Sequence, residues 1–146
     1  MSNAKSIRIF LVEDNEGDVF LAKKALSVMR HPVEFDVQMD GEKVLGHLKE
    51  SVAKGPDSTP DIVFLDLNLP RVSGLELLRS IKLVENLRSI PIVILSSSRS
   101  PQDVAAVYAA GGNSYLPKPK SIEDFRKMAG VIESFWFDYA ILPTKV

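Results

Sequence analysis

The stretch Asp61-Ile62-Val63-Phe64-Leu65-Asp66 decides the fold class of this chain. Its middle is an unbroken apolar run of β-branched, aromatic and leucine side chains, and a carboxylate follows it directly. Such a run is typical of a central strand buried on both faces, which occurs in parallel sheets covered by helices. We therefore expect a strand over Asp61–Leu65. The preceding segment Ser51–Pro60 is rich in Gly, Pro and Ser and is expected to be a surface loop.

Other segments of the chain repeat this pattern. Further β-rich runs are Ile7–Val12, Val33–Met39, Pro91–Leu95 and the weaker Ser114–Leu116. Apolar residues recur at helical spacing after each of the five runs, and the last stripe, Ile122 to Trp136, is the longest and most aromatic. Asp18, Ser73, Ser100 and Ser121 stand at or near the expected helix starts. Strand then helix, five times over, predicts an α/β fold with a doubly wound, five-stranded parallel sheet and five helices.

Composition narrows the function classes. The chain has 146 residues, about the size of one domain, and we assign residues 5–140 to that domain and 141–146 to a short tail. The net charge of −1 argues against nucleic acid as a partner. The absence of cysteine excludes thiolate metal sites and thiol nucleophiles. No apolar run is long enough to span a membrane, so we expect a soluble, cytoplasmic protein that does not act at a membrane.

Carboxylates follow two of the predicted strands. Glu13 and Asp14 come directly after the first strand, and Asp66 follows the third. Ligands of open parallel sheets gather outside the carboxyl ends of the strands, so the three acids converge if these strands are neighbours. A cluster of like charges needs a cation, and oxygen ligands alone favour Mg²⁺. Any one of these aspartates has a simpler interpretation as a turn or cap residue, but three acids at two strand ends weigh against it.

Polar side chains also follow the fourth and fifth strands. Ser96-Ser97-Ser98 offers a hydroxyl donor to a phosphoryl oxygen on Asp66, or is simply a polar loop. Lys118 is a cation that can reach the same acids, or is simply exposed. The Lys118-Pro119 bond is a candidate cis peptide bond that would turn the lysine inward. Together, groups of this kind at four strand ends favour a phosphoryl-transfer site.

The motifs at these strand ends resemble those of the receiver domains of bacterial two-component response regulators, the CheY-like family. The matching segments are Leu11-Val12-Glu13-Asp14-Asn15, Val63-Phe64-Leu65-Asp66-Leu67-Asn68-Leu69-Pro70 with Gly74, Pro91-Ile92-Val93-Ile94-Leu95-Ser96, and Tyr115-Leu116-Pro117-Lys118-Pro119. They cover nearly the whole chain, in the order expected of the family. The resemblance implies the strand order 2-1-3-4-5. Arg71-Val72-Ser73 departs from the more usual Gly-Met-Asp before Gly74.

The resemblance also implies a role for each acidic position. Asp66 looks like the phosphoacceptor. Glu13 and Asp14 look like the pair that holds Mg²⁺, Asp14 directly and Glu13 through water, and the backbone carbonyl of Asn68 is expected to be a further ligand.

Three other positions match the family's switching residues. Ser96 occupies the position of the switch hydroxyl, and Lys118 matches the lysine that contacts the phosphoryl group. Tyr115 occupies the aromatic switch position, whose ring turns inward on activation. We expect Asp66, Ser96 and Lys118 to carry the phosphoryl chemistry together.

The function implied is that of a single-domain response regulator. It would take a phosphoryl group from a sensor histidine kinase and signal through protein contacts, with no enzymatic activity beyond its own phosphorylation and slow dephosphorylation. The Glu13–Val19 segment, Leu67–Pro70 and Phe135-Trp136 are similar to regulators paired with phytochrome-type kinases. A homodimer through the face of the fourth helix, fifth strand and fifth helix is one expected output, with Phe135 and Trp136 either in that patch or packed in the core.

Other interpretations stay open on the sequence alone. The domain could be a phosphorelay intermediate that passes the phosphoryl group to a histidine phosphotransfer protein. A phosphorylation-independent scaffold is disfavoured because all the expected site residues are present. A flavodoxin-type electron carrier is disfavoured because Glu13 and Asp14 would repel a phosphate in the absence of a metal.

Overall fold

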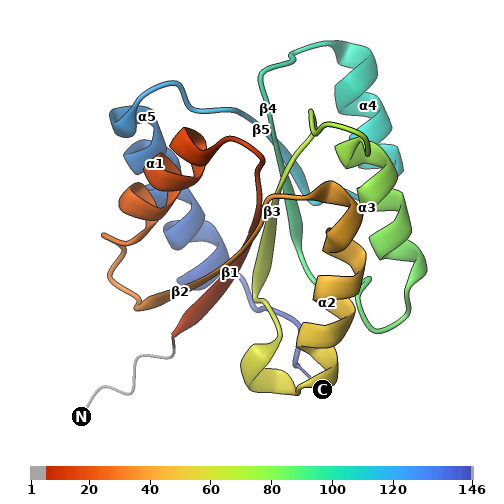
Figure 1. Ribbon diagram of the computed structural model, residues 1–146. Coiled ribbons are helices and arrows are strands. Elements are labelled where there is room, and N and C mark those ends of the chain that lie inside the picture. The colour runs from red at the N-terminus through yellow and green to blue at the C-terminus, as the bar shows by residue number, and fades with distance from the viewer. Residues whose placement is uncertain (1–5, 146) are drawn as a thin grey trace.

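The computed structural model describes residues 6–145, so the predicted domain start at residue 5 and the last tail residue, 146, lie outside the described range. Within that range, five strands alternate with five α-helices (Figure 1). The strands are β1 (Ile7–Val12), β2 (Val33–Gln38), β3 (Ile62–Asp66), β4 (Ile92–Ser96) and β5 (Ser114–Pro117). The helices are α1 (Glu16–Leu26), α2 (Val44–Ala53), α3 (Gly74–Leu83), α4 (Pro101–Ala109) and α5 (Ile122–Ile132). Short turns lie at η1 (Gly41–Lys43), η2 (Pro56–Ser58) and the π-helical η3 (Glu133–Phe137).

The strands form one parallel sheet in the order β2-β1-β3-β4-β5, which confirms the predicted fold class and the strand order implied by the resemblance. Helices α1 and α5 cover one face of the sheet, and α2, α3 and α4 cover the other (Figure 1). Strands β1 and β3 are neighbours, with Val12 paired to Leu65. Because their carboxyl ends coincide, the acids that follow them meet at one edge of the sheet.

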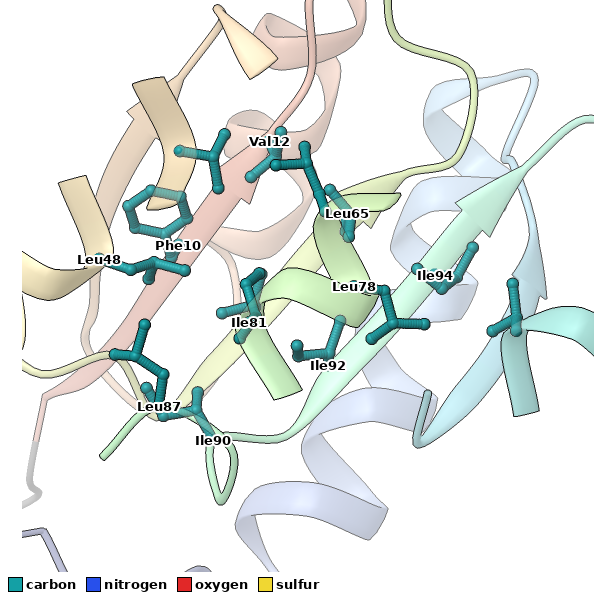
Figure 2. Close-up of a cluster of buried hydrophobic side chains, with 14 of the residues drawn as sticks. Phe10, Val12, Leu48, Leu65, Leu78, Ile81, Leu87, Ile90, Ile92 and Ile94 are labelled. Carbon is teal, nitrogen blue, oxygen red and sulfur yellow. The ribbon is translucent and has the colours of Figure 1, made fainter. Parts of the chain in front are cut away.

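Alternating side chains of the central strands supply two hydrophobic cores. In β1, Phe10 and Val12 join the core under α2, α3 and α4, whereas Ile9 and Leu11 join the core under α1 and α5. Figure 2 shows the first core, in which residues of β1, β3 and β4 contact those of the covering helices. Each large side chain buried in this way stabilises the fold by about 1.5–3 kcal/mol. This two-sided burial explains why the middle residues of these strands are apolar.

The helices begin at or near the polar residues predicted from the sequence, but the cap of α1 is a different residue. Ser73, Ser100 and Ser121 are the N-caps of α3, α4 and α5, as predicted. Asp18 is not a cap, because Asn15 caps α1 and accepts a hydrogen bond from the Asp18 amide at 2.9 Å. Asp18 is therefore the third residue of α1, and its carboxylate is free to make contacts elsewhere.

The aromatic residues that follow α5 are partly packed in the core and partly exposed, the two alternatives left open by the sequence. Trp136 and Phe137 pack against the core under α1 and α5, whereas Phe135 and Tyr139 are exposed. The buried Glu133 carboxylate accepts hydrogen bonds from the backbone amide and Nδ1 of His31, at 3.1 and 2.8 Å. These contacts hold η3 against the loop before β2.

Among residues 6–145, no helix is both long and apolar enough to cross a membrane.

Gly74 allows α3 to begin directly against the end of β3. Its amide donates to the Leu67 carbonyl at 2.9 Å, and a Cβ atom at residue 74 would lie 2.5 Å from the Asp66 carbonyl oxygen. The neighbouring atoms belong to the backbone, so they cannot move aside as a flexible side chain can. Gly46, in α2, has no atom within 4 Å of the equivalent position.

We predict that Gly74→Ala lowers the free energy of unfolding by about 1–3 kcal/mol, because the added methyl group overlaps backbone atoms. The control Gly46→Ala should raise it by about 0.5–1 kcal/mol, because alanine favours the helix and nothing obstructs it. Urea denaturation followed by circular dichroism measures both changes. Equal stability of Gly74→Ala and the unmodified protein would show that the β3–α3 junction is not closely packed.

Candidate functional site

Three carboxylates lie together at the carboxyl ends of β1 and β3. Glu13, Asp14 and Asp66 each contribute one oxygen to a group in which all the oxygens lie within 4.8 Å of one another. Glu13 and Asp66 are buried, whereas Asp14 is exposed. The structure thus brings together the acids that the sequence placed at two neighbouring strand ends.

Lys118 enters this group from the end of β5. Its Nζ atom lies 2.8 Å from Glu13 Oε2, 2.9 Å from Asp18 Oδ2 and 3.2 Å from Asp66 Oδ2. Burial alone would lower the pKa of Lys118, but these carboxylates outweigh it and raise that pKa, so the side chain is a cation. The candidate cis bond before Pro119 is not found, because residues 6–145 contain only trans peptide bonds. The Lys118 amide donates to the Ser96 carbonyl at 2.8 Å, which carries the lysine inward without a cis bond.

Glu13 holds its proton unusually well. Burial raises the pKa of its carboxyl group to about 7, and the charge of Asp66 adds to that rise. The hydrogen bonds from Lys118 and from the Asn15 amide, the latter at 3.1 Å, act in the opposite direction. The acid cluster therefore gains or loses a proton near neutral pH.

Asp66 is held by its own loop. The Asn68 amide donates to Asp66 Oδ1 at 3.1 Å, while Asp66 Oδ2 faces Lys118. Both oxygens of this carboxylate are therefore oriented by neighbouring donors. The backbone amide of Asn68 therefore lies beside the Asp66 carboxylate.

The predicted switch residues form a connected chain through the β4–α4 loop. Ser96 is fully buried, and its hydroxyl oxygen accepts from the Ser98 amide at 3.1 Å. The Tyr115 hydroxyl donates to the Ser98 carbonyl at 2.8 Å, and the ring packs against the core under α2, α3 and α4. Ser98 also donates its hydroxyl to Asp103 of α4 at 2.6 Å. One loop residue thus links Ser96, Tyr115 and α4.

Two structural features were not predicted from the sequence, one in the site and one in the loop after β3. Asp18 contacts Lys118, although its position in the first turn of a helix suggested only a cap. Arg71 has a φ of 67°, a left-handed conformation that favours glycine, and its side chain lies 3.4 Å from Asp40. The usual glycine of the family at this position was a signal for that backbone conformation.

Comparison with known proteins places the chain in a family. Residues 9–130 match the model of the response regulator receiver domain. The response regulator Rcp1 of Synechocystis sp. is 36% identical over 135 residues, which are 92% of this chain and 92% of that protein.

Solved structures of response regulators have the same fold as this chain. The Mn²⁺-bound form of Rcp1 has a TM-score of 0.82 at 35% identity, over 94% of this chain and 99% of that one. The phosphorylated cyanobacterial phytochrome response regulator RcpA has a TM-score of 0.86 at 34% identity, over 96% of this chain and 100% of that one. With its acid cluster and sheet order, the chain belongs to the response regulator receiver domain family and is a signalling protein of the CheY-like type.

Proposed function

We propose that Asp66 accepts a phosphoryl group from a phosphohistidine of a sensor histidine kinase. The observation that carries this proposal is the contact of Asp66 with the Lys118 ammonium group inside a buried acid cluster. The carboxylate oxygen attacks phosphorus, the P–N bond breaks, and the imidazole leaves with the bonding electron pair. Positioning and neutralisation of charge supply most of the catalysis in such a transfer. Lys118 stabilises the charge on the phosphoryl oxygens, and slow hydrolysis of the acyl phosphate resets the domain.

The residues of the cluster fit a magnesium ion. Their donors are carboxylate oxygens, and the ammonium group of Lys118 already lies among them as a cation. Mg²⁺ binds through one or two carboxylates and keeps several waters, which suits the exposed Asp14. Glu13, Asp14, Asp66 and the Asn68 carbonyl would hold the ion. When bound, it would neutralise charge on the phosphoryl group.

Switching follows from contacts that differ between the two states. In our proposal the phosphoryl group attracts the Ser96 hydroxyl, which now accepts from Ser98. Movement of Ser96 would be transmitted to Tyr115 and α4 through the hydrogen bonds of Ser98. The output surface would then be the face of α4, β5 and α5.

The partner proposed is a phytochrome-type histidine kinase in the cytoplasm. Its support is the similarity to RcpA, which is described as a phytochrome response regulator, together with the motifs noted in the sequence. A phosphorelay intermediate would use the same Asp66 chemistry. Phosphotransfer profiling against candidate kinases and histidine phosphotransfer proteins separates the two roles.

A second copy of the chain is the proposed occupant of the exposed surface beside η3. Val131, Phe135 and Tyr139 line a shallow, largely apolar depression there, and Phe135 is 52% exposed. Exposed apolar patches of this kind mark protein contacts. Phe135, rather than the half-buried Trp136, is therefore the residue to test.

We predict that Asp66→Asn abolishes labelling by acetyl phosphate in the presence of Mg²⁺, because the amide has no nucleophilic oxygen of comparable strength. Electrophoresis that separates phosphorylated protein measures the labelled fraction. The control Asp57→Asn removes an exposed aspartate of η2, which precedes β3 and so lies at the opposite end of that strand from Asp66, and it should label normally. Undiminished labelling of Asp66→Asn would exclude Asp66 as the acceptor.

The pKa of Glu13, about 7, predicts a pH dependence of Mg²⁺ binding. Below that pKa the added proton removes one negative charge from the cluster, so affinity should rise with pH between 6 and 8, by at most about tenfold per unit. Isothermal titration calorimetry at several pH values measures the slope. Glu13→Gln, which lacks the titrating group, should flatten it, and an equally steep slope in this variant would contradict the assignment.

For the dimer, Phe135→Ala should shift the molar mass measured by light scattering from dimer towards monomer, because it removes the exposed ring from the contact. Leu83→Ala, at another exposed apolar side chain, serves as the control and should leave the mass unchanged. A Phe135→Ala protein that remains dimeric would count against this surface.

A further inference from the structure

Lys118 has a third carboxylate partner that belongs to neither strand end. Asp18 Oδ2 lies 2.9 Å from Lys118 Nζ, closer than Asp66 Oδ2 at 3.2 Å. Asp18 comes from the first turn of α1, whereas Glu13 and Asp66 follow β1 and β3. The ammonium group is thus surrounded by acids from three different elements.

The position of Asp18 is fixed by the local structure of α1. Asn15 caps the helix, and its side-chain oxygen accepts from the Asp18 amide at 2.9 Å. Farther along, Ala22, Ala25 and Leu26 bury α1 against the sheet and α5. The Asp18 carboxylate is therefore presented by a rigid element, and about a third of the side chain is exposed.

The three partners of Lys118 have different fates in the proposed reaction. Glu13 is a proposed holder of Mg²⁺, and Asp66 becomes an acyl phosphate, a mixed anhydride in which the carboxyl group no longer carries its own charge. Asp18 has neither role, so it remains a charged partner of Lys118 throughout. Without Asp18, the flexible lysine chain would be ordered only by groups that the reaction itself alters.

We propose that Asp18 is a positioning residue that holds the Lys118 ammonium group in place while phosphoryl oxygens replace its contact with Asp66. This inference rests on the proposed function, because it assigns Asp18 a part in that reaction. Asp18 acts through Lys118 and does not touch the phosphoryl group. The gain is pre-organisation: the lysine is already oriented when the transition state forms.

The test compares Asp18→Asn, Asp18→Glu and Glu16→Gln, each made alone and with Lys118→Ala. Glu16 is the matched control, because it is an exposed acid in the same turn of α1. Asp18→Asn should lower the rate constant of acyl phosphate formation at saturating Mg²⁺ and acetyl phosphate by about tenfold, as losses of supporting partners commonly do. Asp18→Glu should restore part of the rate, and Glu16→Gln should leave it unchanged.

The Lys118→Ala background shows whether the effect of Asp18 on the rate of phosphorylation passes through the lysine. If Asp18 acts through the lysine, Asp18→Asn should cause no further loss in that background. A full tenfold loss there, or an unaltered rate for Asp18→Asn alone, would overturn the proposal.

A second measurement needs neither metal nor phosphoryl donor. Proton–nitrogen NMR of the Lys118 ammonium group should give a protected signal in the unmodified protein and in Glu16→Gln. That signal should shift or broaden in Asp18→Asn while the melting temperature stays close to that of Glu16→Gln. An unshifted signal would overturn the contact. If the unmodified protein takes no label, the proposed function fails, and this signal still decides whether Asp18 orders the lysine.

Discussion

The ion pairs of Lys118 are the interaction on which the rest of the site depends. Two buried carboxylates, Glu13 and Asp66, face each other at neighbouring strand ends, and buried charge without a partner is strongly destabilising. The ammonium group supplies that partner at 2.8 and 3.2 Å. A single cation therefore stabilises the acids in the resting domain, and in the proposed reaction it also lies beside the phosphoryl group. In this proposal, stability and function depend on the same contact.

The sheet makes this contact possible. The order β2-β1-β3-β4-β5 places β1 and β3 side by side, and β4 links β3 to β5, the strand that Lys118 follows. Apolar cores on both faces fix the strands, so the residues that follow them have little freedom to drift apart. In the proposed switch, phosphorylation would change the β4–α4 loop, where Ser98 joins the buried Ser96 to Tyr115 and to α4, and would leave the sheet in place.

The sequence was informative where local rules govern the structure. Unbroken apolar runs predicted the central strands, serines before helical stripes predicted three caps, and residues directly after strands predicted most of the site. The contact of Asp18 with Lys118 was beyond such rules, because it joins residues 100 positions apart through the packing of α1. The left-handed backbone of Arg71 could not be read from arginine itself, and only the glycine usual in the family at this position indicated it.

The most direct test of the central claim is to locate the phosphoryl group chemically. Treatment of the phosphorylated domain with borohydride reduces an aspartyl phosphate to homoserine, and peptide mass spectrometry then identifies the altered position. Homoserine is expected at residue 66, formed only when Mg²⁺ and a phosphodonor were both present. Homoserine at Asp14, or at any other aspartate in place of Asp66, would contradict it.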